Sequence, residues 1–143
     1  MKTATTALGF VLVLGLLTVA CGGSDTPTTP TTPTLPSAET FSGTLPVQGS
    51  SFYSFTVAAA GNVSITLASL VATPPGPAQK TVMGLGVGTP SGTECSVTNS
   101  VTTAPGLTAQ LVNSLTPATY CAKIYDLGEL TAPVNFTVRI VHF

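Results

Sequence analysis

The chain has 143 residues, of which 43% are hydrophobic and only 6% are charged, and its formal net charge is −1. An average soluble domain carries about 25% charged residues, so this protein must keep its surface soluble with uncharged polar side chains. Its 4 Lys and Arg residues are too few for the basic stripe that phosphate binding requires, which excludes nucleic acid as a partner. A chain disordered throughout is also excluded, because such chains are poor in apolar residues and rich in charge.

The N-terminal residues have the pattern of a secretory signal. Lys2 precedes an apolar run over residues 7–20, which ends in Ala20. A membrane-spanning helix needs about 20 apolar residues, and this run is shorter. Residues 1–20 are therefore predicted to be a signal peptide that is cleaved off.

The segment LTVACGG at residues 17–23 resembles the lipobox of bacterial lipoproteins. In a lipobox, a small residue precedes a cysteine that is acylated on its thiol and, after cleavage, on its amine. The resemblance implies that Cys21 carries acyl chains such as palmitate and anchors a lipoprotein to a membrane of the bacterial cell envelope, since several chains bind stably where one is marginal. Thr18 replaces the commonest Leu, and Gly22 replaces an Asp typical of inner-membrane retention, which favours the outer membrane. The alternative is an ordinary cleaved signal in which Cys21 is incidental.

Residues 21–39 combine this cysteine with a linker rich in Thr and Pro. Proline recurs at every third position, at Pro27, Pro30, Pro33 and Pro36. Three residues per turn is the period of the polyproline II helix, so residues 26–36 are predicted to be extended and solvated. At about 3.1 Å per residue this stretch spans roughly 34 Å, which suits a spacer between a membrane and a folded domain. A Pro-rich ligand for a partner's groove is the alternative.

The other two cysteines follow from this assignment. With Cys21 carrying lipid, Cys95 and Cys121 remain as a pair in an oxidising compartment, and we expect them to form a disulfide. The closed loop of about 27 residues contributes roughly 3 to 4 kcal/mol in the chain-entropy account. A redox-active thiol pair is the alternative, but the spacing is not CxxC.

From residue 40 onward the hydrophobic pattern has a period of two. Apolar residues alternate in residues 62–67 and again in residues 133–140, and Gly or Pro interrupts the chain too often for a long helix. The sequence predicts one all-β domain over residues 40–143, an antiparallel β-sandwich or jelly roll of seven or eight strands. Between turn signals, the predicted strands are residues 40–45, 51–58, 61–70, 80–88, 94–98, 107–114, 119–126 and 133–142.

Strand parity assigns one face of each predicted strand to the core, and polar residues, chiefly Thr, Ser and Asn, to the outside. The core residues predicted in this way are Phe41, Tyr53, Phe55, Val57, Val63, Ile65, Leu67, Met83, Leu85, Val87, Leu107, Leu111, Tyr120, Ile124, Phe136, Val138 and Ile140.

Five segments of this domain resemble the bacterial pre-peptidase C-terminal domain. They are FSGTL, SFYSFTV, GNVSITL, LTPATYC and NFTV, which start at Phe41, Ser51, Gly61, Leu115 and Asn135. The resemblance covers roughly residues 40–143. It implies a compact, jelly-roll-like and non-catalytic sandwich. Such domains are appended to secreted enzymes and help those enzymes in binding or presentation. Some relatives bind calcium or polymers, but the acidic residues that often precede the second segment are replaced here by Gln48, Gly49 and Ser50.

An enzyme needs a positioned nucleophile, base or metal, and the candidates for these roles are few. The single histidine, His142, cannot form a zinc cluster alone and is predicted to end the last strand. The sequence contains no G-x-S-x-G motif that would support a serine hydrolase. We therefore expect neither catalysis nor a cofactor.

Two weaker candidate sites are left. Asp126 and Glu129 are close in sequence. They form part of a cation or ligand site, or they lie in a solvated turn. Calcium needs six to eight oxygen ligands, so two carboxylates would need backbone carbonyls as further ligands. By strand parity Phe52 and Tyr125 point outward, where aromatic faces bind sugars. The sequence thus predicts a membrane-anchored envelope protein whose non-catalytic sandwich binds or presents a protein or a surface polymer such as a polysaccharide. A structural envelope component and a calcium- or carbohydrate-binding module are the alternatives.

Overall fold

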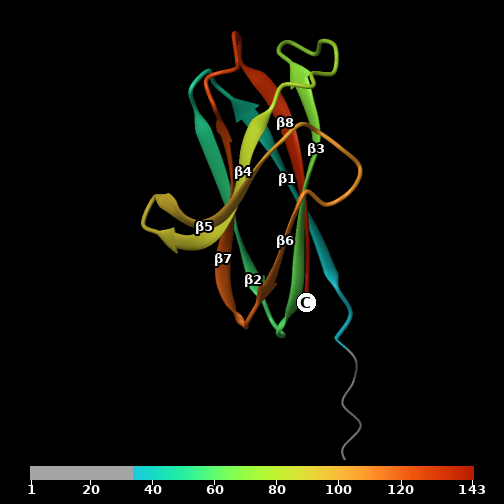
Figure 1. The fold of residues 1–143 in the computed structure, drawn as a ribbon, viewed down its shortest axis with the longest axis vertical. Helices are drawn as coiled ribbons and strands as arrows, with labels where there is room; N and C mark the ends of the chain where they lie inside the picture. Colours follow the sequence, from blue (N-terminus) through green and yellow to red (C-terminus); the bar gives the residue numbers. More distant parts are fainter. Residues whose placement is uncertain (1–33) are drawn as a thin grey trace, which may run out of the picture. The chain divides into compact units, whose positions relative to one another are not determined.

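The computed structural model describes residues 34–143 (Figure 1). The predicted signal peptide, Cys21 and most of the linker lie outside the described residues. Within residues 34–143 there is no helix long and apolar enough to cross a membrane. The strands are β1 (Ser37–Leu45), β2 (Ser50–Val57), β3 (Gly61–Ala72), β4 (Met83–Ser91), β5 (Glu94–Thr103), β6 (Leu111–Leu115), β7 (Ala118–Asp126) and β8 (Val134–His142).

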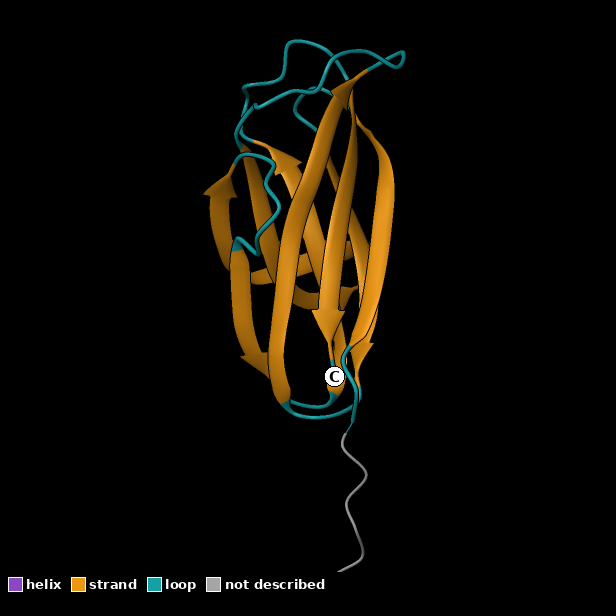
Figure 2. Ribbon diagram, turned by 90° about the vertical axis from the view of Figure 1, so that its right-hand side faces the viewer, coloured by secondary structure: helices purple, strands orange, loops and turns teal. Residues whose placement is uncertain are grey.

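Two antiparallel sheets pack face to face (Figure 2). Sheet A has the strand order β1-β8-β3-β6, and sheet B has the order β2-β7-β4-β5. Only the β4–β5 hairpin joins neighbours within one sheet, and every other connection between the described strands crosses to the opposite sheet. This is the strand order of a jelly roll, so the predicted all-β antiparallel sandwich is confirmed. His142 ends the last strand, as predicted.

The predicted core is largely confirmed. Inward-facing positions of both sheets interdigitate in one apolar layer, as strand parity requires. The predicted residues found buried are Phe41, Phe55, Val57, Val63, Ile65, Leu67, Met83, Leu85, Val87, Leu111, Ile124, Phe136, Val138 and Ile140. Tyr120 is partly buried and packs against this layer. The core also contains residues that the prediction missed, namely Leu45, Leu70, Ala122, Leu130 and Val134.

The prediction that Leu107 is a core residue is wrong, because its side chain is 99% exposed. The strand predicted from residue 107 begins only at Leu111. The preceding loop instead closes the free edge of β3: the side-chain oxygen of Gln110 accepts a hydrogen bond of 2.7 Å from the backbone N–H of Leu67. The N–H of Gly106 also donates to the carbonyl oxygen of Leu67, at 2.9 Å. These bonds hold the loop outside the sandwich, with Leu107 in solvent.

The prediction that Tyr53 is a core residue is also wrong, because it is 36% exposed. Its parity is that of the buried Phe55, but β2 is an edge strand, and Tyr53 lies at the opening between β1 and β2. The Tyr53 ring stacks on Phe41 at a centroid distance of 5.5 Å. Its hydroxyl donates a hydrogen bond of 2.6 Å to Glu39 Oε2. A phenol suits this place, because its ring packs on the core and its hydroxyl reaches a polar partner.

The first and last strands bring both ends of the domain together. In the antiparallel β1–β8 pair, Ser37 lies opposite His142 and Leu45 opposite Val134. β1 therefore begins where β8 ends, at the lower end of Figure 1. The β1–β2, β3–β4 and β7–β8 connections lie at the other end of the sandwich.

Candidate functional site

The outer face of β4 is formed by glycines. Gly84, Gly86 and Gly88 alternate with apolar residues that point into the core. A Cβ atom at Gly84 would overlap the ring of Tyr125, and one at Gly86 would lie 2.7 Å from Val97. Because these positions lack side chains, groups from β5 and β7 lie directly on the β4 backbone.

A β-bulge turns β5 across this glycine face. Val87 pairs with Asn99 and Gly88 pairs with Val97, so Thr98 is the extra residue. Such a bulge bends the strand and increases its twist. Thr98 Oγ1 also donates a hydrogen bond of 3.2 Å to the carbonyl oxygen of Val87, the last residue before the shift.

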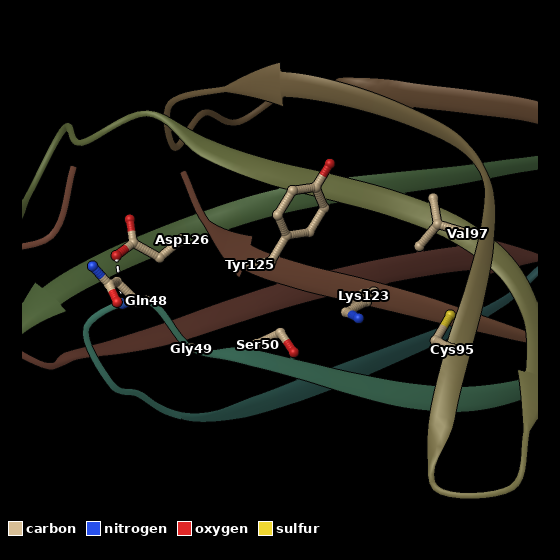
Figure 3. Close-up of a pocket in the computed structure, with 8 residues that line it drawn as sticks. All are labelled: Gln48, Gly49, Ser50, Cys95, Val97, Lys123, Tyr125 and Asp126. Carbon is tan, nitrogen blue, oxygen red and sulfur yellow. Dashed lines mark hydrogen bonds between the residues drawn. The ribbon is translucent and has the colours of Figure 1, made fainter. Parts of the chain in front are cut away.

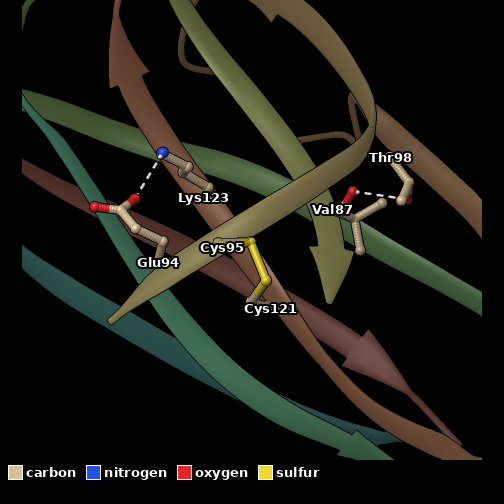
Figure 4. The surroundings of a disulfide bond; sticks show 6 residues. All are labelled: Val87, Glu94, Cys95, Thr98, Cys121 and Lys123. Atoms are coloured by element: carbon tan, nitrogen blue, oxygen red, sulfur yellow. Dashed lines mark hydrogen bonds and ion pairs between the residues drawn. A yellow bond between two sulfur atoms is a disulfide. The ribbon is translucent and has the colours of Figure 1, made fainter. Parts of the chain in front are cut away.

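The predicted disulfide between Cys95 and Cys121 is confirmed (Figure 4). On the N-terminal side of the bulge, β5 carries Cys95 over the outer side of β7. There the Cα of Cys95 lies 5.9 Å from that of Cys121. The two cysteines are 5% and 0% exposed, so the bond is shielded from solvent. It fixes the β4–β5 hairpin against the outer face of sheet B.

The fixed hairpin, β7 and the β1–β2 turn surround a depression of about 320 Å³, which we call the sheet B hollow (Figure 3). Tyr125 and Lys123 project from β7, and Figure 3 shows the Tyr125 ring lying across β4. The residues that line the hollow are Gln48, Gly49, Ser50, Cys95, Val97, Lys123, Tyr125 and Asp126.

Lys123 is the cation of the sheet B hollow. Its side chain is 19% exposed, and its Nζ lies 3.5 Å from Glu94 Oε2 (Figure 4). The Glu94 side chain is 72% exposed. Glu94 precedes Cys95, so the disulfide holds this counter-ion near the hollow. Most of the Lys123 side chain is thus covered, whereas its carboxylate partner remains in water.

The carboxylate of Asp126 is occupied by backbone hydrogen bonds. Oδ1 accepts from the N–H groups of Gly128, Glu129 and Leu130 at 2.9, 3.0 and 3.2 Å, and Oδ2 accepts from that of Gln48 at 2.8 Å. Desolvation raises the pKa of Asp126. The four hydrogen bonds together lower it by more than desolvation raises it, so the pKa lies below its ordinary value. Glu129 is exposed and meets Asp126 through its backbone rather than its carboxylate. Asp126 thus ties the β7–β8 loop to the β1–β2 turn.

The other predicted site residues are partly brought together. Phe52 and Tyr125 are both half-buried on sheet B, and Phe52 lies opposite Lys123 in the β2–β7 pair. Tyr125 lines the sheet B hollow, whereas Phe52 and Glu129 do not. Within residues 34–143 no group of three His, Cys, Asp or Glu residues is arranged to hold a metal ion.

Sequence reasoning missed Lys123, Glu94 and Ser50 as site residues. Two signals for the hollow were present: a lysine among the otherwise apolar residues 120–125, and glycines at alternate positions 84–88. Such a glycine row indicates that another part of the chain covers the strand closely. Neither signal reveals which part covers it.

No protein-family model matches the chain, and a search of curated proteins finds no similar sequence. The resemblance to the pre-peptidase C-terminal domain therefore stays a prediction from the motifs.

Proposed function

We propose that this chain is a lipoprotein of the bacterial cell envelope, lipidated at Cys21 and anchored preferentially to the outer membrane. Its jelly-roll domain, akin to the pre-peptidase C-terminal domain, is a non-catalytic module that binds a protein or a surface polymer. The observation that carries the binding role is the sheet B hollow, which a buried disulfide, a β-bulge and a glycine row together shape. A concavity that is held in shape in this way and has a few convergent polar groups is the usual form of a binding site.

The end of the sandwich at which the linker enters supports presentation away from a membrane. The linker enters at Ser37, at the end where β8 finishes. Gln48, Gly49 and Asp126 of the sheet B hollow belong to the opposite end of the sandwich. A spacer of roughly 34 Å would therefore hold the hollow well clear of the lipid surface.

The chemistry of the lining residues supports binding rather than catalysis. Lys123 is paired with Glu94, and Asp126 accepts four backbone hydrogen bonds. The Asp126 carboxylate is therefore not free to act as a general acid or base, which requires contact with the reacting group. The hydroxyl of Ser50 has no histidine among its neighbours lining the hollow.

Two experiments test this proposal in the cells that produce the protein. Cys21→Ala is expected to move the protein out of the membrane fraction or to block its processing, and unchanged retention with normal processing would contradict the anchor. For binding, a photo-crosslinking amino acid replaces Ser50 in the hollow or, as the matched control, Ser42 on sheet A; both serines are exposed. Adducts specific to position 50 are expected. Equal adducts from both positions would favour a structural envelope component, and no adduct at position 50 would contradict the binding role.

A further inference from the structure

We propose that the sheet B hollow binds a carboxylated sugar unit of an acidic polysaccharide, with the sugar carboxylate taking the place of Glu94 on Lys123. The inference rests on the proposed function, because it names the ligand class for the same hollow. It follows from the Lys123–Glu94 pair and from the aromatic and polar groups around it.

The charged groups at the hollow offer an anionic ligand one point of attachment. Among the described residues they are Lys123, Glu94 and Asp126, and the Asp126 carboxylate is occupied by four backbone N–H groups. Lys123 is therefore the cation that this part of the chain offers to a ligand there. Its partner Glu94 is 72% exposed and 3.5 Å away, and ion pairs with an exposed partner are weak.

Exchange of one carboxylate for another avoids the main cost of binding a charge. Displacing Glu94 returns its side chain to water, where it already lies for the most part. Lys123 stays paired throughout, so a largely covered lysine side chain is not left without a counter-ion. A neutral ligand cannot replace Glu94 without leaving Lys123 without a counter-ion, and the hollow thereby distinguishes acidic from neutral sugars.

The other lining groups suit a sugar better than a protein surface. The ring of Tyr125 is held across β4 by its close fit over Gly84, and a fixed aromatic ring offers a flat apolar face with a polar edge. The hydroxyl of Ser50 and the side-chain amide of Gln48 add hydrogen-bonding groups beside it. Val97 is the one aliphatic side chain in the lining, whereas protein interfaces depend on several buried apolar anchors.

The test uses the full-length lipidated protein in detergent micelles and two probes of identical length. One probe is a hyaluronan oligosaccharide, and the other is the same oligosaccharide with its carboxyl groups reduced to alcohols. We expect the acidic probe to bind about tenfold more tightly, which corresponds to about 1.4 kcal/mol. Calorimetry measures both, and the preference should shrink as salt is raised.

Three variants locate the effect. Lys123→Met is expected to remove the preference for the acidic probe while leaving the weaker binding of the reduced probe. Glu94→Gln is expected to tighten binding of the acidic probe severalfold, because the internal competitor is lost. Lys80→Met is the matched control, since Lys80 is exposed and does not line the hollow, and it should change neither affinity.

The outcomes separate the two proposals. Equal affinity for both probes, weakened for both by Tyr125→Ala, would overturn the acidic preference and leave a sugar-binding module. Binding of neither probe, with adducts at position 50 to an envelope protein, would overturn the sugar class and keep the binding role. If the Glu94→Gln variant binds the acidic probe more weakly than the parent protein does, the idea that the sugar carboxylate replaces Glu94 on Lys123 would be overturned. Failure of both probes together with no adduct at position 50 would overturn the proposed function itself.

Discussion

Tyr53 donates a hydrogen bond of 2.6 Å to Glu39 across the opening between β2 of sheet B and β1 of sheet A. The other oxygen of the same carboxylate lies 2.7 Å from Nε2 of His142, on β8. Glu39 thus links three strands at the end of the sandwich where the linker enters. On the opposite side, Asn99 on β5 donates a hydrogen bond of 2.8 Å to Asn113 on β6. Each side opening of the two-sheet fold is therefore bridged by a side-chain hydrogen bond.

The Glu39 linkage predicts a pH-dependent contribution to stability. The hydrogen bond from Tyr53 is the main cause that lowers the pKa of Glu39 below its ordinary value of 4.5, His142 lowers it further, and burial opposes both. A lowered pKa in the folded state stabilises the fold above the ordinary pKa, and this contribution is lost as pH falls through the lowered value. Glu39→Gln should therefore cost about 1 kcal/mol at pH 7 and progressively less below pH 4.5.

Urea unfolding of both proteins at pH 7 and at pH 3 measures this difference. Glu129→Gln serves as the control, because Glu129 is exposed, and it should change stability at neither pH. A destabilisation by Glu39→Gln that is the same at both pH values would show that the carboxylate charge contributes nothing.

The disulfide predicts a large effect of reduction. The bond joins residues separated by 26 positions, and closing a loop of that size contributes about 3 to 4 kcal/mol. For a domain of this size, the reduced protein or a Cys95→Ala/Cys121→Ala variant should melt more than about 10 °C lower. Calorimetry with and without a phosphine reductant checks this. A Cys21→Ala variant is the control and should respond to reductant as the parent does, whereas an unchanged melting temperature of the parent would contradict the structural role.

Strand parity predicted most of this fold because both sheets face one core, so the alternation in β3 and β8 directly marks the buried side. It failed at Tyr53 because parity does not tell an edge strand from a central one. It failed at Leu107 because the side chain of Gln110 accepts the hydrogen bond from the β3 backbone that a neighbouring strand would otherwise accept. The spacing of apolar residues cannot reveal such a contact.

The candidate site was less predictable, because it depends on contacts between strands that are distant in sequence. Lys123 meets Glu94 only because β5 bends across β4 at Thr98. The backbone bonds of Asp126 come partly from Gln48, which is 78 residues away. The acidic spacing of Asp126 and Glu129 is visible in the sequence, but the groups that occupy Asp126 are not.

Alanine substitutions at two glycines of β4 are predicted to differ in their effect on stability. A Cβ at Gly88 would overlap the backbone of Ser96 on β5, whereas a Cβ at Gly84 would overlap ring atoms at the end of the Tyr125 side chain. Backbone can yield only by shifting the strand, so Gly88→Ala should destabilise by about 2 to 3 kcal/mol. Gly84→Ala should cost less stability but weaken ligand binding, because it displaces Tyr125 from the hollow. Chemical unfolding of both variants, with the exposed Ser42→Ala as the control, measures the difference; equal costs would contradict a tight β4–β5 contact.

Asp126 is predicted to stabilise the domain through its hydrogen bonds and not through a bound calcium ion. Asp126→Ala leaves four backbone N–H groups without their acceptor and should destabilise the domain by about 1 to 2 kcal/mol. Glu129→Ala should be nearly neutral, because the Glu129 side chain is exposed. Since the Asp126 oxygens are already occupied, millimolar calcium should leave the melting temperature of the parent unchanged. Thermal unfolding of the three proteins with calcium and with a chelator decides the matter: a rise with calcium that both substitutions abolish would instead establish a cation site in this loop.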